Sequence, residues 1–266
     1  MALKVCLAGA TGWAGSELAR GIAATVDLRL VAGLSRTGAG KNLGDVLGDT
    51  RLQAPLYASA QEALAVPCDV MVEFTNPASA KDNILCAVRR GVHVVVGTSG
   101  LTDEDYAEID LIACERRVGV LACGNFAITA VLLQMFAVAA AKHLPQWEIV
   151  EYADDHKIDA PSGTVRELVQ RLSQVSQPQM TVPIVQTVGP QEARGASLSG
   201  TQVHCIRLPG HVLGVDVLFG LPDQTLVLRH NSGSGAKPYV GGALLAIRKV
   251  STLSGLHRGL DKVLEL

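Results

Sequence analysis

The stretch Gly9-Ala10-Thr11-Gly12-Trp13-Ala14-Gly15 lies between an apolar run at residues 4–7 and a helical pattern at residues 16–24. A second apolar run follows at residues 28–34. Apolar runs separated by a glycine turn and a helical segment predict a strand, a turn, a helix and a second strand. The glycine spacing is G-x-x-G-x-x-G, one residue longer than the common form. The stretch therefore predicts that the chain begins with a parallel βαβ unit.

The same alternation continues through the first half of the chain. Strand-like runs at residues 70–74, 92–96 and 119–122 are separated by helical stretches at residues 78–90 and 103–116. Strands that alternate with helices form parallel sheets with helices on both faces. We predict an α/β fold whose N-terminal domain is a Rossmann-type doubly wound parallel sheet.

The character of the sequence changes after Asn125, where a long apolar helix is predicted to run to about residue 143. The strand-like runs beyond it are broken by glycines and prolines, which favours an antiparallel or mixed sheet. We predict a second α+β domain for substrate binding and oligomerisation. Its remaining predicted elements are a strand at 147–152, a helix at 163–175 and strands at 202–208, 212–218 and 225–231. The pattern alone leaves open which domain a final helix at 239–250 joins.

Composition excludes several classes of protein. The chain has 266 residues, 48% of them hydrophobic and 18% charged, so it is long enough for one large or two medium domains and is too apolar to be disordered. A net charge of -2 gives no reason to expect a nucleic-acid partner. The longest apolar run, residues 127–141, is shorter than a membrane span of about 18 residues, so we expect no membrane partner. The N-terminus runs directly into a strand pattern without a signal peptide, and we expect a cytoplasmic protein.

No metal site is predicted from the cysteines and histidines. The cysteines include no C-x-x-C pair, and the seven histidines lack the spacing of metal ligands. Most of the cysteines lie in apolar surroundings, so we expect buried thiols rather than disulfides. They are Cys6, Cys68, Cys86, Cys114, Cys123 and Cys205.

The glycine turn also predicts a cofactor. Glycines let the backbone approach a pyrophosphate, and the helix that follows supplies N–H donors and a partial positive charge. Sites for NAD usually carry an acidic residue about 20 residues further on, which binds the ribose 2′-hydroxyl. Here the second strand ends Gly33-Leu34-Ser35-Arg36, and an arginine suits a 2′-phosphate. NADPH is favoured over NADH; the alternatives are a solvent-facing Arg36 and a purely structural glycine turn.

A second motif, His156-Lys157-Ile158-Asp159-Ala160-Pro161-Ser162-Gly163-Thr164, combines ionisable groups with a turn that opens a helix. Such a turn offers N–H groups and hydroxyls to a carboxylate, and Lys157 adds a charge or a proton. The motif predicts a site for an anionic small molecule. The alternative is an N-capped surface helix with incidental charges.

Residues 157–164 resemble the K-x-D-A-P-S-G-T signature of the 4-hydroxy-tetrahydrodipicolinate reductase (dihydrodipicolinate reductase) family of lysine biosynthesis. The N-terminal glycine turn, Glu73-Phe74-Thr75 with Gly97-Thr98-Ser99-Gly100, and Asn125-Phe126 agree in order and approximate spacing. The resemblance spans nearly the whole chain. It implies a homotetrameric reductase that transfers hydride from NADH or NADPH to a cyclic imine-type dicarboxylate. It also implies a cofactor domain of residues 1–125 plus 239–266 and a substrate and oligomerisation domain of residues 126–238.

The resemblance assigns roles to individual residues. It implies that Lys157 serves catalysis and that Gly163 and Thr164 bind a substrate carboxylate, and we add Ser162 of the same turn. His156 and Asp154 are further catalytic candidates, and Asp154 is also a candidate substrate contact. The cofactor contacts expected are Gly9, Ala10, Thr11, Gly12, Trp13, Ala14, Arg36, Phe74, Gly97, Thr98, Ser99, Gly124, Asn125, Phe126 and Ala127.

The chain departs from the family pattern around this motif. The family writes E-x-H-H-x-x-K, with the first His as the proposed proton donor, whereas Ala153 and Asp154 stand at the His-His pair here. Gly235 stands where H-x-A-x-S-R has an arginine, and Asp216 stands where G-E-H has a histidine. A pocket for a dianion needs cationic partners, so these changes predict a less basic pocket. Asp154 or Asp155 could instead pair with an amine or iminium.

Three functions follow from this pattern. The first is the family reaction, with Lys157, His156 or a water as proton donor. The second is a divergent paralogue that reduces a different imine or carbonyl substrate, less anionic or amine-bearing. The third is a non-catalytic NADPH-binding sensor. A short-chain dehydrogenase or epimerase would need a Y-x-x-x-K pair, which the sequence lacks.

Overall fold

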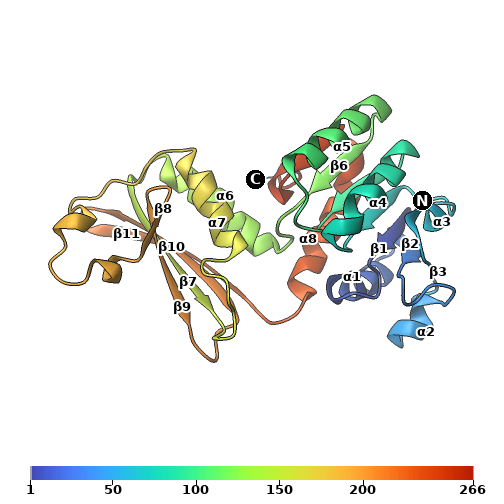
Figure 1. Ribbon diagram of the computed structural model, residues 1–266, viewed down its shortest axis with the longest axis horizontal. Coiled ribbons are helices and arrows are strands. Elements are labelled where there is room, and N and C mark those ends of the chain that lie inside the picture. The colour runs from blue at the N-terminus through green and yellow to red at the C-terminus, as the bar shows by residue number, and fades with distance from the viewer. Residues whose placement is uncertain (1, 266) are drawn as a thin grey trace. The chain divides into compact units, whose positions relative to one another are not determined.

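The computed structural model describes residues 2–265 and divides the chain into two compact units (Figure 1). Within the described residues, unit 1 comprises residues 2–128 and 235–265. Unit 2 is Thr129–Ser234. The chain therefore leaves unit 1, builds unit 2 and returns to unit 1 for its last segment.

Unit 1 is built on a seven-stranded parallel sheet in the order β12-β6-β5-β4-β1-β2-β3. From β1 the chain moves outward through β2 and β3, then crosses to β4 on the other side of β1. The carboxyl ends of β1 and β4 thus lie at the point where strand order reverses, where ligands bind in such sheets. The strands are β1 (Leu3–Ala8), β2 (Leu28–Leu34), β3 (Leu56–Tyr57), β4 (Val70–Glu73), β5 (His93–Val96), β6 (Gly119–Ala122) and β12 (Gly255–Arg258).

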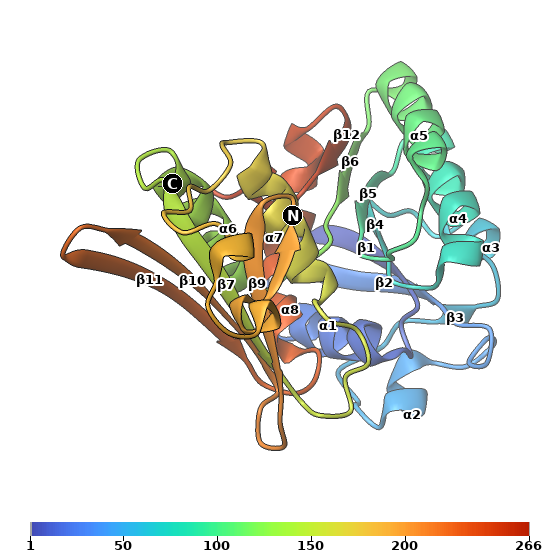
Figure 2. The same cartoon turned by 60° about the vertical axis from the view of Figure 1, so that its left-hand side comes forward.

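Helices cover both faces of this sheet. On one face, α1 (Trp13–Ala23) packs beside α8 (Lys237–Lys249) (Figure 2). On the other, Cys6 and Ala8 of β1 share a buried core with residues of α3 (Ala60–Ala63), α4 (Pro77–Arg89) and α5 (Asp103–Arg116). This two-sided burial explains the continuous apolar runs, because alternate residues of a strand point to opposite faces. The smaller elements are α2 (Leu43–Leu47), η3 (Val250–Thr252) and η4 (Leu260–Lys262).

Unit 2 contains a five-stranded mixed sheet in the order β11-β10-β7-β9-β8. Strands β7 and β9 pair in parallel, and the other pairs are antiparallel. Trp147 and Ile149 of β7 pack against α6 (Ile128–Ala141) and α7 (Gly163–Ser173), which cover one face of the sheet. The other elements are β7 (Gln146–Ala153), β8 (Ala196–Leu198), β9 (Thr201–Arg207), β10 (Leu213–Leu221), β11 (Gln224–Ser232), η1 (Ile184–Gln186) and η2 (Gln191–Arg194).

The predicted fold class is confirmed: a Rossmann-type parallel sheet and a second mixed-sheet unit are both present. The long elements begin and end within a few residues of the predicted bounds, and the β2 and β6 bounds match. The short elements α2, α3, β3, β8 and β12 were not predicted, because none of them contains an apolar run longer than two residues. None of the helices within residues 2–265 has the length and hydropathy that a bilayer crossing requires.

Candidate active site

The glycine turn after β1 is shaped by close backbone contacts. Gly9 has a φ of +78°, and a Cβ there would lie 2.3 Å from the Phe74 carbonyl oxygen. A Cβ on Gly15 would lie 2.0 Å from the Gly9 carbonyl oxygen. Any side chain would therefore push the turn away from β4 or from the first turn of α1. The glycines at these two positions are required by packing.

The N-terminus of α1 is open to a ligand. Gly12 is the N-cap residue and contributes no side-chain cap, and the first turn of the helix contains no acidic residue. The first N–H groups of a helix have no partner within it, and they carry a partial positive charge. This arrangement fits a pyrophosphate, and an acidic first turn would have opposed one.

A cavity of about 480 Å³ opens beside this helix N-terminus, and it is lined entirely by unit 1. Phe74 and Phe126 meet edge to face in its wall with ring centroids 5.5 Å apart. The cavity brings together ten of the predicted cofactor contacts from separate loops, namely Gly12, Trp13, Ala14, Phe74, Gly97, Thr98, Ser99, Gly124, Asn125 and Phe126. It also includes Thr75, Asn76, Pro77, Cys123 and Tyr239, which are not among the predicted cofactor contacts.

The remaining predicted cofactor contacts lie outside the lining of this cavity. Ala10 is fully buried and its N–H donates to the Leu34 carbonyl. Thr11 Oγ1 lies 2.8 Å from the hydroxyl of Ser35, which joins the glycine turn to the end of β2. Arg36 follows Ser35 and is exposed. Ala127 is buried, with its N–H donating to Asn125 Oδ1 at 2.8 Å.

A buried carboxylate joins two loops of the cavity. Glu73, the last residue of β4, has no exposed surface. Its Oε1 accepts the Thr75 N–H at 2.7 Å and the Thr98 hydroxyl at 3.3 Å, and its Oε2 accepts the Asn83 amide at 2.9 Å. Burial raises the pKa of Glu73, and these hydrogen bonds oppose the rise. Glu73 is not among the predicted site residues, although an acid inside the apolar run at 70–74 is a usable signal.

The second motif links the end of β7 to the start of α7 in unit 2. Ser162 is the N-cap of α7, and its Oγ accepts the Val165 N–H at 3.4 Å. The Ser162 N–H donates to Glu151 of β7 at 3.0 and 3.2 Å, to the two carboxylate oxygens. Ser162 is therefore buried with its hydroxyl and N–H both engaged, whereas the next residue, Gly163, is exposed.

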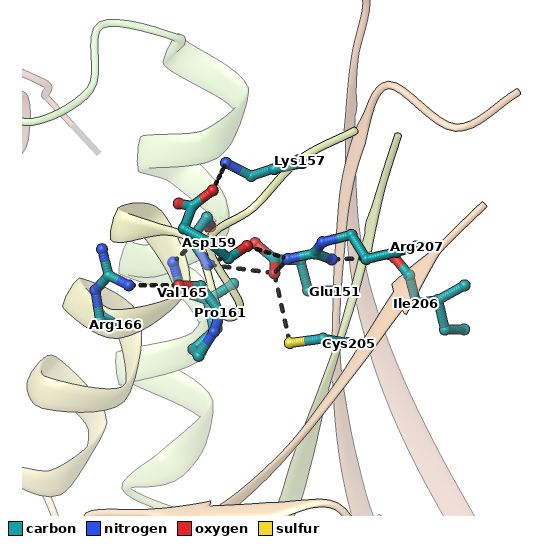
Figure 3. Close-up of polar contacts among 10 residues, drawn as sticks. Glu151, Lys157, Asp159, Pro161, Val165, Arg166, Cys205, Ile206 and Arg207 are labelled. Atoms are coloured by element: carbon teal, nitrogen blue, oxygen red, sulfur yellow. Dashed lines mark hydrogen bonds and ion pairs between the residues drawn. The ribbon is translucent and has the colours of Figure 1, made fainter. Parts of the chain in front are cut away.

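Lys157 is partly exposed and forms an ion pair with Asp159, with Nζ 2.5 Å from Oδ1. The contact with Lys157 lowers the pKa of Asp159. The pair places an ammonium beside the turn that precedes α7, as Figure 3 shows. If its ion pair with Asp159 opens, Lys157 can donate a proton at this position or bind an anion.

His156 and the two aspartates before it form a separate exposed cluster. His156 Nδ1 lies 2.9 Å from Asp154 Oδ1 and 3.0 Å from Asp155 Oδ1, and its side chain is 90% exposed. The His156 backbone N–H, followed by its ring, lowers the pKa of Asp154. One ligand atom from each of these residues lies within 4.8 Å of the others, which is close enough for a shared cation. In the structure the three groups pair with one another.

The positions that depart from the family pattern have specific surroundings. Ala153 is fully buried at the end of β7. Gly235 has a φ of +100°, a backbone conformation that an arginine rarely adopts. Asp216 is buried and is bonded by the Arg229 Nε at 2.6 Å and the Tyr152 hydroxyl at 3.1 Å. Its register with Val150 of β7 puts it on the sheet face opposite Glu151, so its charge is neutralised away from the motif at 157–164.

Family models match both units. One described as "Dihydrodipicolinate reductase, N-terminus" matches residues 3–126, and one described as "Dihydrodipicolinate reductase, C-terminus" matches residues 129–264. The 4-hydroxy-tetrahydrodipicolinate reductase of Desulfitobacterium hafniense (strain DSM 10664 / DCB-2) is 37% identical over 99% of both chains. The enzyme of that name from Geobacillus kaustophilus (strain HTA426) is 36% identical over the full length of both.

A solved structure agrees with these matches. The dipicolinate-bound dihydrodipicolinate reductase from Paenisporosarcina sp. TG-14 superposes with a TM-score of 0.88 at 30% identity. The comparison covers 99% of this chain and 100% of that chain. The structural similarity therefore extends over both units, including the C-terminal segment of unit 1 from Gly235 onward.

Proposed function

The chain belongs to the dihydrodipicolinate reductase family, and on this premise we propose that it reduces 4-hydroxy-tetrahydrodipicolinate, a cyclic imine-type dicarboxylate, with NAD(P)H in lysine biosynthesis. The proposal is supported by the presence of two features in the same chain. An open, glycine-lined helix N-terminus stands beside a cavity in unit 1, and a capped anion turn stands beside Lys157 in unit 2. A reductase of a small carboxylate needs both.

The residues of unit 1 fit a nicotinamide dinucleotide. Gly9 and Gly15 allow the close backbone packing of the turn, and the α1 N-terminus supplies N–H donors for the pyrophosphate. When bound, the cofactor supplies the hydride. Exposed Arg36, at the end of β2 without an acidic neighbour in sequence, supports a preference for NADPH through its pairing with a 2′-phosphate.

In unit 2, the first residues of α7 are assigned to the substrate carboxylate. The Ser162 N–H donates to Glu151 and its hydroxyl oxygen accepts the Val165 N–H, so we assign the carboxylate to Gly163 and Thr164, as the family resemblance implies. Ser162 then acts as the cap that holds them. Lys157 Nζ delivers the proton that accompanies hydride transfer, because it is the partly buried cation of the motif, whereas His156 is exposed and held by two aspartates.

The proposal is tested by turnover of the substrate and by the cofactor preference. We expect the purified protein to oxidise NADPH only when 4-hydroxy-tetrahydrodipicolinate is supplied, at a kcat of about 1–10³ per second. We expect Arg36→Ala to raise the KM for NADPH and to leave the KM for NADH unchanged. Binding of NADPH without its oxidation by any imine or keto acid would contradict an enzymatic role and favour a sensor.

A second candidate function rests on the missing cations. Where the family has a His-His pair, this chain has a buried methyl group and a carboxylate, Ala153 and Asp154, and the backbone at Gly235 is unsuited to an arginine. A pocket with fewer cations favours a monocarboxylate or an amine-bearing imine. A screen of imines and keto acids with NADPH decides between the two candidates, since the paralogue would turn over one of these faster than the lysine-pathway intermediate.

We also propose a homotetramer, as the family resemblance implies. The sheet face of unit 2 that α6 and α7 do not cover carries Leu218 and Val227, which are cross-strand partners 37% and 48% exposed. Apolar side chains paired on an open sheet face favour association with another copy.

A further inference from the structure

We propose that Glu151 and Arg207 are positioning residues for the substrate reaction, forming a buried charge pair that holds the anion turn and keeps it electrically neutral. The proposal rests on the function proposed above and adds residues that the signature at 157–164 does not contain. Glu151 has no exposed surface, and the Arg207 side chain is 17% exposed. Both therefore lie behind the turn and do not form part of its open surface.

The pair fixes both ends of the segment from Asp159 to Ser162 (Figure 3). Arg207 Nη2 donates to the Asp159 carbonyl oxygen at 2.7 Å, which fixes the first residue of the segment to β9. Glu151 accepts the Ser162 N–H, which fixes the last residue to β7. The adjacent strands β7 and β9 thus determine where α7 begins, and with it the positions of Gly163 and Thr164.

The same contacts set the charge beneath the turn. A carboxylate 3.0 Å from the Ser162 nitrogen lies at the helix end where a substrate carboxylate is expected. Alone it would repel that ligand, because like charges at short range interact strongly where water is excluded. Arg207 Nη2 lies 2.7 Å from Glu151 Oε2 and cancels this charge. Arg207 therefore matters for binding even though its Nη2 is engaged by Glu151 and Asp159.

This proposal separates an electrostatic role from general structural support. Arg207→Met leaves the Glu151 charge unpaired behind the turn. Adding Glu151→Gln removes that charge while keeping an oxygen for the Ser162 N–H. If the unpaired charge causes the loss of substrate affinity, Glu151→Gln restores the affinity that Arg207→Met removes. If the two residues only support the fold, the double variant is at least as impaired as either single variant.

The experiment measures the Kd of dipicolinate by calorimetry on the NADPH complex, together with KM and kcat. For Arg207→Met we expect Kd and KM to rise about 10- to 100-fold, as for loss of a charged hydrogen-bonding partner. The affinity for NADPH, which binds unit 1, should not change. Glu151→Gln/Arg207→Met should recover most of the loss, and Arg207→Lys should recover part of it by restoring the charge. The matched control is Arg171→Met, which breaks the Arg171 pair with Glu167 on α7 and should leave Kd unchanged.

Two outcomes would overturn the proposal: wild-type dipicolinate affinity in Arg207→Met, or a double variant no better than Arg207→Met. Should Arg207→Met fail to fold, the double variant and Arg207→Lys decide the question by the same comparison with wild type. Failure of the proposed function looks different, because wild-type protein would then neither bind dipicolinate nor turn over the substrate.

Discussion

At the scale of single residues, the site depends on which polar groups are already engaged within the protein. Ser162 and Lys157 belong to one motif, yet Ser162 donates its N–H to Glu151 and accepts the Val165 N–H at the start of α7, whereas Lys157 pairs with the partly exposed Asp159. A group held by one partly exposed partner can exchange it for a ligand at small cost. This difference supports Lys157 rather than Ser162 as the group that meets the substrate.

Replacing Lys157 tests this directly. We expect Lys157→Ala to lower kcat by about 10²–10⁴-fold, the usual cost of removing a general acid. His156→Ala is the matched control and should stay close to wild type, because His156 is exposed and pairs with Asp154 and Asp155. Steady-state kinetics with NADPH measure both variants. Retained activity in Lys157→Ala would remove the catalytic assignment.

Glu73 predicts a pH dependence of stability. Burial raises its pKa in the folded protein above its ordinary value of 4.5, so folding favours the protonated form. The contribution of Glu73 to the free energy of unfolding is therefore largest at or below the ordinary value and declines as pH rises through the raised pKa.

Urea unfolding of wild type and Glu73→Gln between about pH 4 and pH 8 measures this contribution, since glutamine does not titrate. We expect the stability of wild type relative to Glu73→Gln to fall as pH rises. A difference independent of pH would show that Glu73 titrates as it does in the unfolded chain.

At the scale of elements, paired strands neutralise buried charge. Asp216 of β10 stands directly opposite Arg229 of β11, and the arginine covers a carboxylate that is only 3% exposed. Opposite charges in such cross-strand positions stabilise a sheet. The pair explains how an aspartate occurs at a buried position where the family pattern has a histidine.

Removing Arg229 should therefore destabilise unit 2. We expect Arg229→Met to lower the denaturant concentration at the midpoint of unfolding, because it leaves a buried carboxylate with the Tyr152 hydroxyl as a remaining partner. Denaturant unfolding followed by circular dichroism measures the change. Asp216→Asn/Arg229→Met should recover part of the loss, and an equally unstable double variant would argue against a charge effect.

At the scale of the whole molecule, each unit carries one part of the proposed reaction. Unit 1 has the cavity proposed for the cofactor, and unit 2 has the turn proposed for the substrate anion and a sheet face with exposed Leu218 and Val227. The chain passes from unit 1 to unit 2 and back, so unit 2 is inserted in sequence between two segments of unit 1.

If the protein assembles as the proposed tetramer, a mutation on the open sheet face of unit 2 should alter assembly and leave the fold intact. Leu218→Glu places a charge on the open sheet face, and we expect it to dissociate the tetramer in sedimentation velocity without loss of secondary structure. Leu111→Glu is the matched control, because Leu111 is an equally apolar, 62% exposed residue on α5 of unit 1. A monomeric wild-type protein would refute the assembly itself.

The sequence alone determined the fold class, the glycine turn at 9–15 and the family. Repeated alternation of apolar runs with helical segments predicts a parallel sheet, and the turn at 9–15 follows a strand and opens a helix, so local patterns were sufficient. The signature at 157–164 is contiguous and needed no tertiary information. The edge strands β3 and β12 were not predicted, because neither contains an apolar run longer than two residues.

Only the tertiary structure decided which polar and charged groups face one another. Glu73 and Thr98 are 25 residues apart, and Glu151 and Arg207 are 56 apart, so no spacing rule connects them. Strand pairing brings these groups within hydrogen-bond distance and excludes water from them. The register of β10 likewise moved Asp216 away from the anion turn, although the sequence suggested that it reduced the charge of the pocket. The charge of a side chain follows from the sequence, whereas its partner and its burial depend on the packing of strands that are far apart in sequence.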